Sequence, residues 1–161
     1  PHYLEWKAKE YNFNTHFIAL AGGINRKMPE FTVEKALRVL AEAGVPVRGA
    51  KVLVLGVAYK RDIPDYRESP AIEVIRGLRR LGAEVEYHDP HVPRFAEGGL
   101  AMKSVPLSEE RVREKDLVLI ATDHSAFDYK AIVAQARRVL DARGATRHLP
   151  RELTEGKVVL L

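Results

Sequence analysis

The sequence has 161 residues, of which 46% are hydrophobic and 30% are charged. This globular composition excludes a disordered tail, a collagen-like chain and a coiled-coil rod, and it suits one domain with an additional element. The net charge of +4 favours an anionic partner, but the basic residues are scattered among 22 acidic ones. Because they form no basic stripe with interleaved aromatic residues, we expect a phosphorylated small molecule and no nucleic acid.

The sequence contains no cysteine, which excludes a disulfide framework, a thiolate zinc site and a cysteine nucleophile within this chain. No apolar run reaches the ~20 residues of a membrane helix, and no signal peptide opens the chain. We therefore expect a soluble, cytoplasmic protein that makes no membrane contact. Because the chain starts at Pro1, we expect either that the initiator methionine was removed or that this is a piece of a longer protein.

Helical spacing of apolar residues dominates the first 46 residues. A first helical run covers 3–10 and should break at 12–14. A second run follows, which Pro29 should kink or interrupt and Gly44 should end.

Gly22 and Gly23 lie inside the second run, where glycine is a poor helix former. They belong either to an ordinary surface helix or to a helix whose small face lets another helix approach closely. We favour the second interpretation, because this helix precedes the main domain and has little else to pack against.

Apolar strands alternate with amphipathic helices in the rest of the chain. Residues 51–57 form a near-continuous apolar run, which is typical of a strand buried on both faces. Ser69 and Pro70 suit the start of a helix and Gly82 its end. The segment between residues 88 and 108 is expected to be a loop. The remaining predicted elements are strands at 84–88, 116–121, 138–141 and 157–161, and helices beginning at Ser108 and Asp128.

This alternation predicts an α/β fold with a parallel sheet and right-handed crossovers. We expect a Rossmann-like, doubly wound parallel sheet over 47–161, preceded by a helical arm over 1–46. Ligands of such sheets bind outside the carboxyl ends of the strands, so the loops at those ends are the candidate sites.

The loop after the first strand is the main candidate. It lacks the G-x-G-x-x-G pattern that a dinucleotide pyrophosphate requires, and it carries Lys60, Arg61 and Arg67 instead. Any single cation could merely keep the surface soluble. Together with the aromatic ring of Tyr59, the three favour a nucleotide diphosphate bound by side chains. Arg143, at another strand end, could reach the same ligand.

Histidines and acids at the strand ends leave other chemistries open. His88 and His91 flank Asp89, so a metal site is conceivable, but a loop with hydrogen-bonded imidazoles is the commoner outcome and we assign no metal. His124 follows Asp123, which suggests either an acid/base pair or a turn with local hydrogen bonds. In the first loop, the two acids Asp62 and Asp65 could bind Mg²⁺ or simply balance the neighbouring cations.

Five short segments together carry a family signature. They are Gly56-Val57-Ala58-Tyr59-Lys60, Arg67-Glu68-Ser69-Pro70, Tyr87-His88-Asp89-Pro90, Ala121-Thr122-Asp123-His124 and Asp141-Ala142-Arg143-Gly144. They resemble the carboxyl-terminal domain of the UDP-glucose/GDP-mannose dehydrogenase family. Residues 1–8 and 28–30 are similar to the start of the family's central helix, with the branch that oxidises UDP-N-acetylhexosamines carrying a very similar stretch.

The resemblance implies an enzyme in three parts. Family members have an amino-terminal NAD-binding domain, a central helix that forms a homodimer, and a carboxyl-terminal Rossmann-like domain that binds UDP. They oxidise the C6 alcohol of a UDP-sugar to a carboxylate with two NAD⁺, through a cysteine nucleophile just upstream of the segment that matches Pro1. Since this chain has no cysteine, the resemblance implies the carboxyl-terminal part of such an enzyme of polysaccharide biosynthesis, inactive by itself.

The resemblance also implies roles for four residues. Tyr59 and Lys60 match positions that contact the nucleotide sugar, and Arg143 matches an arginine that reaches the UDP part. Arg67 matches an arginine that approaches NAD across the cleft between domains. No residue matches the family's general base or nucleophile, so we assign no catalytic residue.

Two alternatives remain beside the dehydrogenase. One is a free-standing nucleotide-binding module without a redox role. The other is a phosphoacceptor regulatory domain of the same α/β class, for which Asp62 and Asp65 are a weak match.

Overall fold

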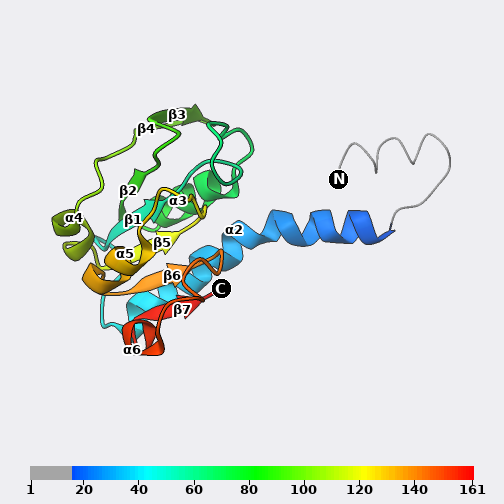
Figure 1. Ribbon diagram of the computed structural model, residues 1–161. Coiled ribbons are helices and arrows are strands. Elements are labelled where there is room, and N and C mark those ends of the chain that lie inside the picture. Colours follow the sequence, from blue (N-terminus) through cyan, green and yellow to red (C-terminus); the bar gives the residue numbers. More distant parts are fainter. Residues whose placement is uncertain (1–15) are drawn as a thin grey trace.

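The computed structural model describes residues 16–161, which form an α/β fold with a long helix extending from it (Figure 1). Five strands make one sheet in the order β2-β1-β5-β6-β7, and all neighbouring strands are parallel. The strands are β1 (Lys51–Leu55), β2 (Glu84–His88), β5 (Leu117–Ile120), β6 (Val139–Asp141) and β7 (Val158–Leu160). The helices are α2 (His16–Glu42), α3 (Pro70–Arg80), α4 (Glu109–Arg113), α5 (Tyr129–Gln135) and α6 (Arg151–Thr154).

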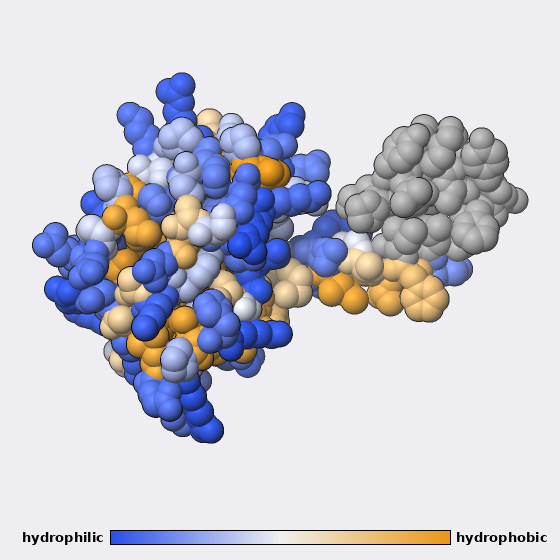
Figure 2. All heavy atoms as spheres, in the orientation of Figure 1, coloured by the Kyte–Doolittle hydropathy of each residue, from blue (hydrophilic) through white to orange (hydrophobic). Residues whose placement is uncertain are grey.

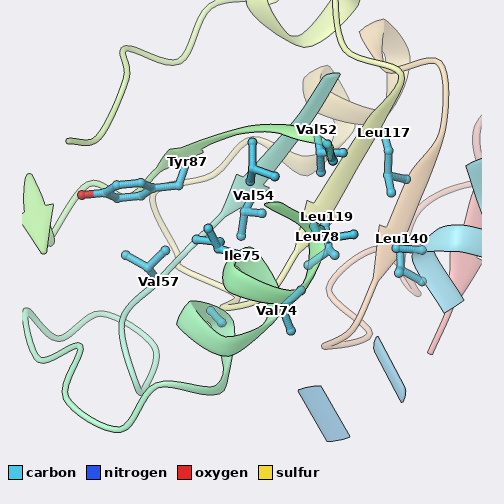
Figure 3. Close-up of a cluster of buried hydrophobic side chains, with 14 of the residues drawn as sticks. Val52, Val54, Val57, Val74, Ile75, Leu78, Tyr87, Leu117, Leu119 and Leu140 are labelled. Atoms are coloured by element: carbon cyan, nitrogen blue, oxygen red, sulfur yellow. The ribbon is translucent and has the colours of Figure 1, made fainter. Parts of the chain in front are cut away.

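Helices cover both faces of the sheet, which confirms the predicted doubly wound arrangement. Successive side chains of a strand point to opposite faces. Val52 and Val54 accordingly belong to the core shared with α2 and α3, which Figure 3 shows in close-up. Leu53 and Leu55 belong to the core on the other face, shared with α4 and α5. Each fully buried Val or Leu contributes about 1.5–3 kcal/mol, which explains the near-continuous apolar run of β1.

The second half of α2 is part of the domain core. Ala36 and Leu40 are fully buried among residues of β1 and α3. Of the two effects predicted for Pro29, a kink or an interruption, the interruption is wrong, because α2 is one continuous helix. Packing of the helix against α3 and the sheet outweighs the hydrogen bond that a proline cannot make. Gly44 follows the helix with a φ of 72°, as a terminating glycine should.

The first half of α2 extends away from the sheet (Figure 1). The predicted helix over 3–10 and the break at 12–14 lie outside the described residues. No helix within residues 16–161 combines the length and apolar character needed to cross a membrane.

The segment predicted to be a loop contains a β-hairpin instead. Strands β3 (Arg94–Glu97) and β4 (Leu100–Lys103) pair antiparallel around Gly98 and Gly99, which have φ values of 55° and 78°. Such positive φ values at both central residues make the tight turn that hairpins prefer. Arg76 of α3 donates to the carbonyl of Gly98 over 2.7 Å and ties the turn to the domain. The short helix α6 was not predicted either.

Candidate functional site

A cavity of about 390 Å³ opens at the carboxyl ends of the strands. Its walls come from α2, the first turn of α3 and the segments that follow β1, β5 and β6. The chain leaves β1 towards β2 on one side of the sheet, whereas β5, β6 and β7 lie on the other side. The cavity therefore lies at the point where the strand order reverses, which is where doubly wound sheets bind ligands.

Three of the four predicted site residues line this cavity together. Tyr59 and Lys60 come from the segment after β1, and Arg143 comes from the segment after β6. The Lys60 Nζ lies 5.8 Å from the centre of the Tyr59 ring, and the Nε of Arg143 donates to Asp123 over 3.1 Å. Among the described residues, the charged side chains that line the cavity, Lys60 and Arg143, are both cations.

Arg67 does not line the cavity. Its guanidinium donates through Nε and an Nη to the two carboxylate oxygens of Asp65, over 2.9 and 2.8 Å. These bonds lower the pKa of Asp65 from 3.8 to about 2. The Arg67 side chain is 81% exposed, so it faces solvent beside the loop instead of joining Lys60.

Gly56 lets the ends of β1 and β5 meet closely. Its φ is 81°, and a Cβ placed on it would lie 2.5 Å from the carbonyl oxygen of Thr122. The hydroxyl of Thr122 donates to the carbonyl of Ala58 over 2.7 Å, just beyond this contact. Only glycine combines that backbone conformation with that close approach.

The carboxylate of Asp89 is buried behind the segment after β1. Its Oδ2 accepts the backbone N–H groups of Val57 and Ala58 over 2.7 and 2.9 Å, and its Oδ1 accepts those of His91 and Val92. Burial by itself would raise the pKa of Asp89. The hydrogen bonds from His124 and from backbone N–H groups outweigh burial and lower the pKa to about 2, so Asp89 is a buried anion.

His124 is fully buried, and its hydrogen bonds identify its tautomer. The Nδ1 atom accepts the backbone N–H of Asp62 over 2.9 Å and therefore carries no proton. The hydrogen is on Nε2, which faces the Asp89 Oδ2 at 3.0 Å and donates to it. Of the two alternatives for His124, the acid/base pair with Asp123 is not formed, because both ring nitrogens of His124 have other partners. Asp123 accepts from Arg143 instead.

The arrangement of histidines differs from the conceivable metal site around Asp89. The His88 Nδ1 contacts the carbonyl of Val105 at 2.7 Å, away from His91. Ligand atoms of Asp62, His91 and His124 lie within 4.8 Å of one another. A metal there would break the hydrogen bond between His124 and the amide of Asp62.

Asp62 and Asp65 both have protein partners. Asp62 accepts the backbone N–H and the hydroxyl of Ser125, each over 2.8 Å, and these bonds lower its pKa to about 2. Asp65 accepts from Arg67, as described above. Both acids therefore accept hydrogen bonds from neighbouring protein groups, as the interpretation in which they balance their neighbours predicts.

Comparison with known proteins identifies the family. Residues 53–148, which include all four predicted site residues, match the UDP-binding domain of the UDP-glucose/GDP-mannose dehydrogenase family. The chain belongs to this family. Since β1 to β6 fall within or overlap the matched range, the family domain corresponds to most of the sheet and to the cavity at its edge.

The relatives include dehydrogenases of UDP-N-acetylhexosamines. The chain is 31% identical over 155 residues to a UDP-N-acetyl-D-mannosamine dehydrogenase of Pyrococcus horikoshii, and these cover 93% of the chain and 34% of that relative. It is 27% identical over 127 residues to a UDP-N-acetyl-D-glucosamine 6-dehydrogenase of Salmonella typhi, covering 79% of the chain and 30% of the relative.

Solved structures agree with this assignment. A structure of UDP-D-ManNAc dehydrogenase from Pyrococcus horikoshii superposes with a TM-score of 0.74 at 25% identity, and covers 95% of this chain and 35% of that one. The chain thus spans about a third of the length of the relatives that it matches.

Proposed function

We propose that this chain is the nucleotide-sugar-binding part of an NAD-dependent UDP-sugar 6-dehydrogenase, and that the cavity at the strand ends binds the UDP moiety. One observation carries the proposal: Tyr59, Lys60 and Arg143 line one cavity at the point where the strand order of the sheet reverses. Among the described residues, the two charged side chains that line this cavity are both cations. The family match over the same residues supports it.

Each of the three side chains has a role that suits UDP. Lys60 and Arg143 pair with the diphosphate, because ammonium and guanidinium groups make charge-assisted hydrogen bonds to phosphate oxygens. The Tyr59 ring, 48% exposed, offers a face to the base. The first turn of α3 also lines the cavity, so the positive end of its dipole adds to the attraction for an anion.

The reaction of the whole enzyme would be oxidation of the C6 alcohol to a carboxylate, with two NAD⁺ reduced. A UDP-N-acetylhexosamine destined for polysaccharide biosynthesis is the proposed substrate, since relatives named for UDP-N-acetylmannosamine and UDP-N-acetylglucosamine match most of this chain. We keep the cytoplasm as the proposed location.

The residues of this chain do not fit a main NAD site. The segment after β1 has one glycine in place of a glycine-rich turn, and the chain has no cysteine. Asp89 directly follows β2, where dinucleotide-binding folds present an acid to a ribose, but here it is buried and bonded to backbone N–H groups. NAD and the nucleophile are therefore assigned to a part outside this chain, with Arg67 approaching NAD from this side.

We assign 1–46 to a homodimerisation arm, the second half of whose helix α2 packs into the domain core, and 47–161 to the UDP-sugar-binding domain. Phe17, Leu20 and Ile24 are 89%, 61% and 53% exposed and share one face of α2. Figure 2 shows hydrophobic surface along the part of α2 that extends from the body. In a symmetric dimer, the same stripe on the arm of a second copy would pack against these three side chains.

Calorimetric titration of the 161-residue chain with UDP and with NAD⁺ tests the proposal. UDP should bind and NAD⁺ should not. Lys60→Ala should weaken UDP binding by about ten-fold or more, because a hydrogen bond to a charged group contributes about 1.5–3 kcal/mol.

Lys51→Ala is the matched control, because Lys51 is an exposed lysine at the opposite end of β1 and does not line the cavity. It should leave UDP affinity unchanged. Tight binding of NAD⁺, or equal UDP affinity for Lys60→Ala and the unaltered chain, would contradict the proposal.

A further inference from the structure

The segment that carries Tyr59 and Lys60 belongs to no helix or strand. Residues 56–62 connect β1 to the loop before α3 without regular secondary structure. Backbone N–H groups of such a segment need partners from elsewhere if they are buried, and Val57 and Ala58 are buried. The partners that satisfy these groups therefore decide where Tyr59 and Lys60 lie.

Asp89 supplies two of these partners from the end of β2. One carboxylate oxygen accepts the consecutive N–H groups of Val57 and Ala58. Two donors converging on one charged oxygen fix the direction of the backbone immediately before Tyr59.

His124 extends the same network from the end of β5. Its Nε2 donates to the Asp89 oxygen that holds Val57 and Ala58, and its Nδ1 accepts the N–H of Asp62. The pair therefore holds the backbone on both sides of the Tyr59–Lys60 dipeptide.

Two further hydrogen bonds hold the backbone of the same segment. The carbonyl of Ala58 accepts the hydroxyl of Thr122, and the N–H of Tyr59 donates to the carbonyl of Asp65 over 2.7 Å. The side chains of Tyr59 and Lys60 are exposed, whereas the backbone N–H groups of residues 57, 58, 59 and 62 are all hydrogen-bonded.

A buried anion is a costly way to fill this space. Asp89 is 3% exposed, and its hydrogen-bond donors among the described residues are backbone N–H groups and His124, with no lysine or arginine. An apolar side chain would avoid the cost of burying charge but could accept none of these N–H groups. The carboxylate instead contributes by fixing the backbone conformation of residues 57–62, through the N–H groups that it accepts.

We propose that Asp89 and His124 are positioning residues of the nucleotide-sugar site: they hold residues 57–62 so that Tyr59 and Lys60 face the cavity. This inference rests on the proposed function. Neither side chain lines the cavity, so both act through the segment and not by touching the ligand.

The test is a double-mutant cycle on UDP affinity, measured by calorimetry on the full chain. Asp89→Asn should weaken UDP binding at least ten-fold, because the amide places N–H donors against backbone N–H groups. In a Lys60→Ala background, Asp89→Asn should cost much less, since the contact that the segment positions is already absent. A merely structural role for Asp89 would give equal losses in both backgrounds.

Two His124 variants separate the halves of the network and serve if Asp89→Asn does not fold. The side chain of His124→Gln can keep an N–H donor near the position of Nε2 and so preserve Asp89. That of His124→Asn can keep an acceptor near the position of Nδ1 but loses the donor. We expect His124→Gln to bind UDP within about three-fold of the unaltered chain and His124→Asn to bind at least ten-fold more weakly.

Val133→Ala is the stability control, because Val133 is fully buried on α5 and does not line the cavity. It should lower the unfolding temperature and leave UDP affinity unchanged. Unchanged affinity in folded Asp89→Asn, additive losses in the cycle, or equal affinity of the two His124 variants would overturn the inference. If the unaltered chain binds no UDP, the proposed function itself fails and this inference falls with it.

Discussion

Gly56 is constrained twice, by its own backbone conformation and by the carbonyl of Thr122. Gly49 provides a comparison, because it has the same φ of 81° but open space where the Cβ of a substituted residue would lie. Gly49→Ala should cost about 1–2 kcal/mol, the strain of a left-handed alanine. Gly56→Ala should cost at least ~2 kcal/mol more, since the backbone of β1 or β5 must move. Urea unfolding measures both, and equal costs would show that the close approach is not required.

Asp89 makes stability depend on pH in the acid range. Its pKa falls from 3.8 in the unfolded chain to about 2 in the folded chain, so the folded state binds the proton less readily. The stabilisation, about 2 kcal/mol, is present above pH 4 and is lost as the pH falls towards 2.

Unfolding midpoints measured between pH 6 and 2 test this dependence. Asp89→Asn should be less stable than the unaltered chain at pH 6, and the difference should shrink by pH 2. Asp62 and Asp65 have lowered pKa values as well, but they remain in both proteins and cancel in the comparison. A difference that stays constant over the whole range would contradict a charged Asp89.

The sequence predicts the position of candidate-site residues that directly follow a strand. It does not predict hydrogen bonds between side chains that are far apart in the sequence. Tyr59, Lys60 and Arg143 follow strands, so the rule for parallel sheets places them at one edge, and in the structure they line one cavity. The pair of His124 with Asp89 joins residues far apart in the sequence, whereas its neighbour Asp123 suggested a local pair. No signal in one sequence distinguishes the two partners, because the choice depends on how β2 and β5 lie across β1.

At the scale of elements, the exposed stripe of α2 carries the dimer proposal. Ile24→Glu places a charge on the stripe formed with Phe17 and Leu20, so it should convert a dimer to a monomer. Arg26→Glu is the control, because Arg26 is exposed on a different face of the same helix. Sedimentation velocity distinguishes the states. A dimer that persists in Ile24→Glu, or a monomeric unaltered chain, would contradict the arm's assigned role.

Elements were predictable where local signals and packing agree. Helix α3 begins at the predicted Ser69 cap, whose hydroxyl accepts the N–H of Ala71, and the five strands of the sheet appear within a few residues of their predicted ranges. The hairpin was missed although Gly98-Gly99 between two short runs is a turn signal. The continuity of α2 through Pro29 depends on tertiary packing, which a local rule does not contain.

The whole molecule should bind substrate without turning it over. Because the chain has no cysteine and no glycine-rich dinucleotide turn, we expect no NADH when it is mixed with NAD⁺ and a UDP-N-acetylhexosamine. Absorbance of NADH measures this, with a full-length relative as the positive control. Sustained NADH formation by the pure chain would contradict the assignment of NAD and the nucleophile to a part outside this chain. It would require a complete active site within these residues.

The most direct test of the central claim is to locate bound UDP on the domain. Amide resonances of the isotopically labelled chain would be followed by NMR as UDP is added. The shifts should concentrate in 25–32, 57–60, 69–74, 121–123 and 142–144, the segments around the cavity, and the same titration of Lys60→Ala should require more UDP. Shifts confined to other parts of the sheet, such as the amino ends of β1 and β2, would show that the nucleotide site lies elsewhere.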